Sequence, residues 1–465
     1  MENRDNKFPK QIKYIVGNEA CERFSFYGIK GILAAFITSR LLMSEDQAVS
    51  IMHLFVGINY LMPLLGGWVS DRFWGRYKTI LWVSLLYCLG HAVLAMSDVS
   101  ADVETRKWVM MTGLMCIAFG SGGIKPCVSA FMGDQFKPEQ SFLLKKAYAA
   151  FYWSINFGSC FAFLVIPFVQ SHYGWSWAFV IPGVTMALAT TIFWLGRRSY
   201  INVPPSGKKE KGTGVFSIWM YCWRNKKKGT SFWDAATGRF TEEQIDGARS
   251  VVRILKIFSL IPPFFALFEQ TASSWLMQGE RMVTVPLDFG FFKWTIEAAQ
   301  LQSANPIFVM ILIPIISLFI YPRITWLNSA VRRMSCGMIF AAIAFGIVAW
   351  IQFKLEGGAH MSLVWQILPY LALTIGEILL STTGLEFAFT QAPPKMKSMI
   401  TSFWNLTIAI GNFMVSLITV VFQVDGEGHS VTTGRFLFYA GMMLIVAFLF
   451  IWVSSRVMSG EKKHV

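Results

Sequence analysis

Four charged side chains share one helical face in the apolar stretch 12–37. They are Glu19, Glu22, Arg23 and Lys30. Residues three, four, seven or eleven positions apart lie on the same side of an α-helix, and this face extends about 16 Å at 1.5 Å per residue. A charge at the bilayer centre costs roughly 2.5–3.5 kcal/mol, so we expect the face to line a water-filled cavity or a bundle interior. Side chains placed there could bind charged solutes or exchange protons.

An ion-paired stripe with a purely structural role is the alternative interpretation, with Glu19 and Glu22 paired to Arg23. Lys30 weighs against it, because this residue lies two turns from those acids and needs another partner.

Three further charges lie deep within later apolar stretches, away from their ends, namely Lys125, Glu269 and Glu377. The first half of the chain thus supplies three deep cations, whereas the second half supplies only carboxylates. A cavity between the halves would have a positive wall and a negative wall, which suits a zwitterion. Because four carboxylates oppose three cations, one carboxylate could hold a proton.

Neutral polar side chains accompany these charges and share helical faces with one another. His53 stands alone in the stretch 50–69, and a proton-transfer role and a satisfied packing role both remain open for it. The neutral residues are Tyr152 with Asn156, Asn305 before Pro306, and Ser381 one turn after Glu377.

The composition indicates an all-α polytopic membrane protein. Of the 465 residues 54% are hydrophobic and only 15% are charged, whereas soluble proteins are about a quarter charged. The net charge of +14 would suggest nucleic acid in a soluble chain, but cytoplasmic loops of membrane proteins also collect Lys and Arg. We therefore expect a lipid bilayer around the protein and no nucleic acid partner.

Twelve apolar stretches are long enough to span a bilayer as helices, and they divide into two sets of six. About 30 of the 41 Lys and Arg fall on one side, which predicts that both termini are cytoplasmic. The predicted units are a six-helix bundle at 1–196, a cytoplasmic linker at 197–252 and a second bundle at 253–465. In the linker, Thr241 and Gln244 form a capping-box pattern, which predicts a short interfacial helix leading into the seventh span. The predicted spans are 12–37, 50–69, 78–97, 108–132, 143–169, 176–196, 253–277, 301–321, 330–353, 362–390, 398–424 and 434–455.

Motifs of soluble catalytic sites are missing from the sequence. It contains no HExxH, no GxSxG and no paired Cys/His set, and its seven cysteines are scattered. We therefore expect no enzyme activity, no metal and no cofactor, with an intramembrane enzyme as the alternative.

The charged stretches resemble motifs of a known transporter family. EACERFSFY at 19–27 resembles the ExxERFxYY motif of the proton-dependent oligopeptide transporters, a branch of the major facilitator superfamily. The similarity continues in order along the whole chain. The further motifs are GGWVSDRFWGRYK at 66–78, FGSGGIKP at 119–126 with DQF at 134–136, FYWSINFG at 151–158, ALFEQ at 266–270, QSANP at 302–306, and GLEF at 384–387 with QAP at 391–393.

The resemblance implies roles for individual side chains around a bound peptide. Its carboxylate would bind Arg23, Lys30 and Lys125. Its amine would bind Glu377, helped by Asn156 and Asn305. The pocket would be lined by Tyr27, Tyr60, Tyr152, Ser381, Trp275 and Trp404. The proton-coupling residues would be Glu19, Glu22, Glu269 and His53.

By this resemblance, we expect a major facilitator fold and a proton-coupled symporter that imports di- and tripeptides across the cell membrane by alternating access. Protons are the coupling ion, and two latches are expected: Lys30 with Glu269 on the external side and Lys125 with Glu377 on the internal side. The alternatives are a relative that imports another substrate such as nitrate, and a peptide sensor that does not transport. Two departures from the family pattern are Lys30 in place of Arg and Phe26 in place of the first Tyr.

Overall fold

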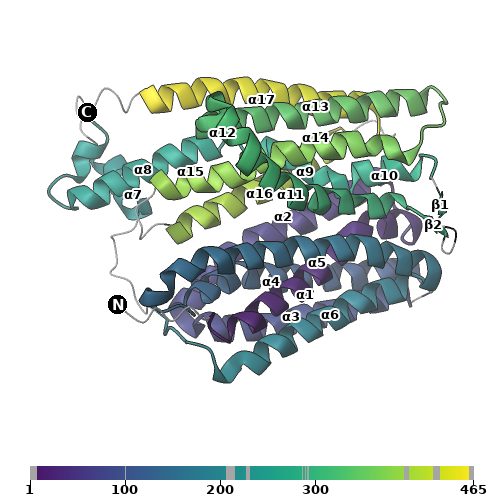
Figure 1. The fold of residues 1–465 in the computed structure, drawn as a ribbon, viewed down its shortest axis with the longest axis horizontal. Helices are drawn as coiled ribbons and strands as arrows, with labels where there is room; N and C mark the ends of the chain where they lie inside the picture. The colour runs from purple at the N-terminus through teal and green to yellow at the C-terminus, as the bar shows by residue number, and fades with distance from the viewer. Residues whose placement is uncertain are drawn as a thin grey trace.

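The first part of the chain forms a bundle of long helices that run nearly parallel and antiparallel to one another (Figure 1). This computed structural model describes residues 8–99, 101–205, 215–226, 231–284, 286–288, 290, 293–391, 397–422 and 430–459. Gly75 and Gly174, both at positive φ, allow the sharp turns before the third and sixth helices. The helices are α1 (Ile12–Ser39), α2 (Glu45–Val69) with a π-helical turn at Ser70–Trp74, α3 (Arg76–Ala95), α4 (Val103–Gly133), α5 (Leu144–Tyr173) and α6 (Trp175–Leu195).

The second bundle lies beside the first and is more broken (Figure 1). Its first span is interrupted at 259–261 and again at Glu269–Ser273, and two of its spans contain π-helical turns. Its helices are α8 (Glu242–Phe258), α9 (Pro262–Phe268), α10 (Ser274–Glu280), α11 (Ala304–Ile315), α12 (Tyr321–Arg323), α13 (Ala330–Glu356), α14 (Ile367–Glu377), α15 (Thr383–Gln391), α16 (Lys397–Val421) and α17 (Thr433–Ser459). The π-helical turns are Ile316–Ile320 between α11 and α12, and Ile378–Thr382 between α14 and α15.

Ten helices in the described part of the chain are long and apolar enough to cross a membrane. The bent pair Glu242–Phe258 and Pro262–Glu280 makes an eleventh if it is one span. The charged helix α1 lies among these helices in the first bundle (Figure 1). The all-α polytopic fold is therefore confirmed, and the count of twelve stays a prediction.

Glycines allow helices of the first bundle to pack closely. A Cβ added at Gly66 of α2 would lie 2.6 Å from the Cα of Gly123 in α4, which is too close for any side chain. Small residues at such crossings increase dispersion contacts where lipid supplies no hydrophobic driving force. The α2–α4 crossing fixes where Asn59 and Lys125 stand relative to each other.

The predicted capping box is confirmed at the start of α8. Thr241 and Gln244 exchange side-chain and backbone hydrogen bonds around Glu242. Two elements were not predicted. A second linker helix, α7 (Val215–Asn225), packs against α8, and the strands β1 (Pro286–Asp288) and β2 (Lys293–Thr295) pair antiparallel between α10 and α11.

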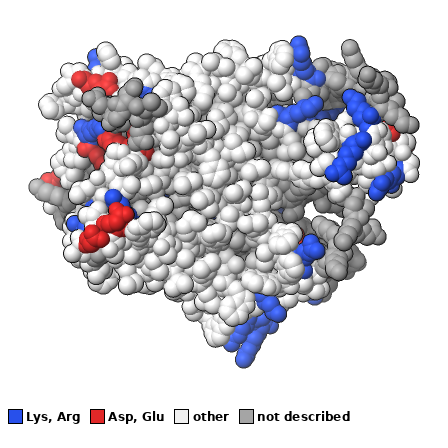
Figure 2. Space-filling view, turned by 180° about the vertical axis from the view of Figure 1, so that it is seen from behind, with Lys and Arg blue, Asp and Glu red and all other residues white. Residues whose placement is uncertain are grey.

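Charges separate between the two ends of the molecule. Figure 2 shows Lys and Arg gathered at one end, here called the basic end, and most Asp and Glu at the other, here called the acidic end. The start of α1 and the end of α17 both lie at the basic end (Figure 1). Arg72 after α2, Lys145 at the start of α5 and Arg198 after α6 are exposed. Lys and Arg are enriched in cytoplasmic loops, so the basic end is expected to face the cytoplasm.

Candidate functional site

The charged face predicted for α1 is buried within the first bundle. Arg23 Nε lies 2.9 Å from Glu19 Oε1, and its Nη2 lies 2.5 Å from Glu22 Oε2. The Ser121 hydroxyl of α4 donates to Glu22 Oε1 at 3.2 Å. The pairs required by the structural alternative are therefore present. In this conformation Arg23 is occupied by two carboxylates, and the three side chains together carry one net negative charge when both acids are ionised.

Lys30 forms the expected ion pair across the two bundles. Its Nζ lies 2.5 Å from Glu269 Oε2, and the two side chains are only 6% and 3% exposed. Glu269 begins a short 3₁₀ turn at the break between α9 and α10, which turns its carboxylate toward α1. The pair thus joins the middle of α1 to the interrupted span of the other bundle.

His53 is a second buried link between the bundles. Its Nδ1 lies 2.8 Å from Asn412 Oδ1 of α16, and its Nε2 lies 2.9 Å from Ser273 Oγ. Asn412 donates its own amide to Ile408 O, so its oxygen faces the ring and His53 Nδ1 carries the proton. Ser273 Oγ also lies 3.5 Å from Gln270 O. The serine can donate to a neutral ring, or accept from a protonated ring while donating to that carbonyl.

Lys125 and Glu377 do not pair, contrary to the expected internal latch. Within the described residues, no carboxylate oxygen lies within 4 Å of Lys125 Nζ, which donates instead to Asn59 Oδ1 at 2.5 Å. Glu377 Oε2 accepts from Asn305 Nδ2 at 2.8 Å. Each charge therefore has a neutral amide partner within its own bundle.

Contacts between the bundles concentrate toward the acidic end. Gln302 Nε2 donates to Gly31 O at 3.0 Å, and Gln300 Nε2 donates to Leu164 O at 2.9 Å. Figure 2 shows the surface hollowed between the bundles at the basic end. The molecule is thus closed toward the acidic end and open toward the basic end. Other contacts of the closed end are the ion pair of Arg281 with Glu45, and the hydrogen bonds of Ser430 with Asp46 and of Ser50 with Ser416.

The tyrosines assigned to the pocket remain partly accessible. Tyr152 of α5 is 40% exposed, and Tyr27 and Tyr60 are half-buried. Asn156 is buried and donates to Tyr152 O one turn earlier at 3.0 Å. Ser381 is half-buried in the π-helical turn that directly follows Glu377. Such turns often mark functional positions in helices, since they turn side chains out of the regular register.

The two tryptophans assigned as side walls do not line open space in this conformation. Trp275 is fully buried in the second bundle, and its ring packs against Phe345 and Tyr370. Trp404 is 5% exposed and packs against Phe258 and Phe265. Both rings fill helix crossings, so their contribution here is to the core.

Three polar residues of this region were missed in the sequence: Asn59, Ser273 and Asn412. Each is a neutral polar side chain in an apolar stretch, and this was the only feature of the sequence that could have identified it. Such residues often only bond across helices, so their type alone could not separate them from packing residues.

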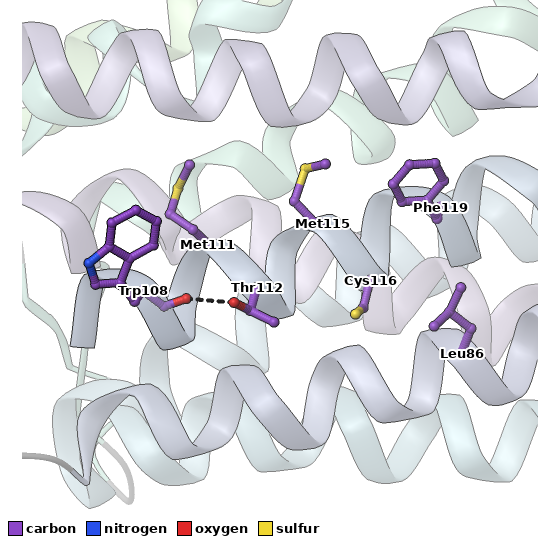
Figure 3. Close-up of a pocket in the computed structure, with 7 residues that line it drawn as sticks. All are labelled: Leu86, Trp108, Met111, Thr112, Met115, Cys116 and Phe119. Carbon is purple, nitrogen blue, oxygen red and sulfur yellow. Dashed lines mark hydrogen bonds between the residues drawn. The ribbon is translucent and has the colours of Figure 1, made fainter. Parts of the chain in front are cut away.

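A separate groove lies on the outer face of α3 and α4 (Figure 3). It has a volume of about 480 Å³ and contains no charged side chain. The hydroxyl of Thr112, its most polar lining group, already donates to Trp108 O at 2.8 Å. The groove therefore offers no charged group to a charged solute, and we assign it to the lipid-facing surface.

Comparisons with known proteins agree with this architecture. The chain is 34% identical over 368 residues to peptide transporter family 1 of Drosophila melanogaster, covering 76% of this chain and 49% of that protein. It is 33% identical over 421 residues to solute carrier family 15 member 2 of Mus musculus, covering 86% and 56%. The chain thus spans about half the length of the curated relatives it matches.

Solved structures match over almost the full chain. A crystal structure of an auto-inhibited POT family peptide transporter superposes with a TM-score of 0.87 at 38% identity, covering 96% of this chain and 97% of that one. The POT family transporter PepTSo gives the same TM-score and identity, with coverage of 97% and 99%. Residues 77–428 match the model of the POT family. These matches agree with the buried charges that face each other across the two helix bundles. The chain therefore belongs to the POT family of transporters and is not an enzyme.

Proposed function

We propose that this protein is a symporter of the cell membrane that imports di- and tripeptides together with protons by alternating access. The observation that carries the proposal is the state of the two cross-bundle pairs. Lys30 and Glu269 are joined, whereas Lys125 and Glu377 each hydrogen-bond a neutral amide and form no ion pair with a described residue. A peptide zwitterion supplies a carboxylate for the cation of one bundle and an amine for the carboxylate of the other.

Recognition of the two peptide termini accounts for a broad substrate range. The main-chain charges of every dipeptide are alike, so binding them gives affinity without reading side chains. Half-buried Tyr27 and Tyr60 and the more exposed Tyr152 offer aromatic surface to variable side chains. A longer peptide would have to pass one of the two charged walls.

Protons enter this scheme through carboxylates that are paired with cations. Protonation of Glu269 removes its charge and weakens its hold on Lys30, which favours opening of the acidic end. Protonation of Glu19 or Glu22 would likewise release part of Arg23 for a substrate carboxylate. His53 links the bundles beside the first pair, and Ser273 can adapt to either protonation state of the ring.

The direct test is uptake of labelled dialanine into liposomes under an inward proton gradient. We expect gradient-driven uptake that excess dialanine blocks and free alanine does not. Glu377→Gln should raise the KM for dialanine at least about tenfold, since a buried charge partner of the amine is lost. Glu104→Gln, at the exposed start of α4, is the matched control and should behave as wild type.

Three outcomes would contradict parts of this proposal. Binding of dialanine without uptake would indicate a sensor. Neither binding nor uptake would indicate another substrate, for which nitrate is the first to try. Uptake with an unchanged KM in Glu377→Gln would refute the assignment of Glu377 to the amine.

A further inference from the structure

The ammonium of Lys125 is held in an unusual set of contacts. It lies 3.9 Å from the ring centre of Tyr60 and 4.3 Å from that of Phe26. Its one hydrogen bond to a described residue goes to Asn59 Oδ1 at 2.5 Å. Two aromatic faces and one carboxamide oxygen attract a cation without neutralising it. These contacts to described residues do not compensate the positive charge of the ammonium, and they use only one of its N–H donors.

Asn59 fixes this arrangement from the neighbouring helix. Its side chain is fully buried, and the α2–α4 crossing at Gly66 and Gly123 holds the two helices in close contact. Lysine has only donors, so the oxygen of Asn59 must face Lys125 and the amide nitrogen must point away. That nitrogen is buried and has no hydrogen-bond partner among the described residues. A buried amide nitrogen without a hydrogen-bond partner lowers the stability of the fold, which argues against a role of Asn59 in packing alone.

We propose that Asn59 is a positioning residue for recognition of the substrate's anionic end. It holds the Lys125 ammonium between Tyr60 and Phe26 and keeps it free of any protein carboxylate until a substrate carboxylate arrives. A neutral acceptor suits this task, since it orients the ammonium and leaves the full positive charge for the ligand. The inference deepens the proposed function and rests on it.

The test compares two ligands that differ only at the C-terminus, dialanine and dialanine amide. Each competes with labelled dialanine for uptake by reconstituted full-length protein, and the ratio of their inhibition constants measures preference for the carboxylate. In Asn59→Asp the new carboxylate is isosteric and pairs with Lys125, so it competes with the ligand. We expect the preference to fall at least about tenfold, while affinity for the amide changes less than about threefold.

Asn59→Leu supplies an independent measurement. It removes the acceptor and leaves the ammonium unanchored, so the preference should fall here too, with KM affected more than the maximal rate. Asn18→Leu is the matched control. Asn18 is a fully buried amide of the same bundle that donates to Ala189 O, and its oxygen has no hydrogen-bond partner in the described part of the chain. Its preference should equal that of wild type.

The outcomes separate this inference from the proposed function. If wild type takes up dialanine and both Asn59 variants keep its carboxylate preference, the positioning role is refuted and the function stands. The same conclusion holds if Asn18→Leu loses the preference equally. If wild type takes up no peptide, the proposed function itself fails. Should either Asn59 variant not fold, the other one decides.

Discussion

Replacing Glu269 by glutamine should open the acidic end of the molecule. The ion pair with Lys30 joins α1 to the broken span of the second bundle, and both side chains are almost fully buried. Removing one partner of a buried pair costs about 3–5 kcal/mol, because the other charge stays buried without compensation. Glutamine still offers an acceptor oxygen to Lys30, so we take the lower figure, about 3 kcal/mol, as the loss of stability of the closed state. This loss shifts the equilibrium between the closed and open states roughly a hundredfold toward the open state.

This shift can be measured as a distance between the bundles. Leu42 lies between α1 and α2 and is 76% exposed, and Val364 lies just before α14 and is 54% exposed. Spin labels at these two positions report the separation of the bundles at the acidic end, in a background without the seven free cysteines. We expect one short distance in wild type at neutral pH and a longer second population in Glu269→Gln.

Acidification should act on wild type in the same direction as the substitution. Protonated Glu269 is neutral like glutamine, so a lower pH should populate the longer distance in wild type but change the variant less. A double variant, Lys30→Met with Glu269→Leu, is the control. Well-packed apolar residues replace buried pairs at little cost, so it should stay closed at every pH.

The reasoning would be refuted by a Glu269→Gln protein that keeps the wild-type distance distribution while it still binds dialanine. The closed end would then depend on the other cross-bundle contacts. The pair of Glu45 with Arg281 is the first to examine, although its more exposed side chains give it a smaller expected share.

Two predictions concern stability. Gly66→Ala should destabilise the first bundle by about 1–3 kcal/mol, because its Cβ would meet the backbone of Gly123. Gly346→Ala is the control and should have no such effect, because nothing lies within 4 Å of its added Cβ. Thermal unfolding in detergent compares the two variants, and equal midpoints would contradict the close crossing of α2 and α4. Thr241→Ala should lower the free energy of unfolding by about 1 kcal/mol, because the side-chain cap of α8 is lost, whereas Thr241→Ser should keep the cap. If both variants lower the thermal unfolding midpoint equally, the cause is something other than capping.

The sequence predicted the features that depend on local spacing. The charges of α1 do lie together because helical periodicity alone places them there, and the Thr241 capping box needs only four consecutive residues. Tyr152 and Asn156 share a face for the same reason. In each case the relevant neighbours are within about three turns of one helix.

What the sequence did not predict depends on contacts between distant segments. The sequence around Lys125 does not indicate that Asn59 is its partner, because their contact depends on how α2 and α4 cross. The burial of Trp275 depends likewise on where α13 and α14 pack. The expected pairing of Lys125 with Glu377 is absent from this structure, where each side chain has an amide partner in its own bundle, and those partners also depend on how distant segments pack.

The chain joins its two bundles once, through the segment between Leu195 and Glu242 at the basic end (Figure 1). A covalent tether therefore remains at that end however far the bundles separate, whereas the described contacts across the acidic end are all non-covalent. Shortening the tether should restrict opening of the basic end and leave opening of the acidic end unaffected. Opening of the basic end would thus depend on the length of the linker, whereas opening of the acidic end would depend on the charges that join the bundles there.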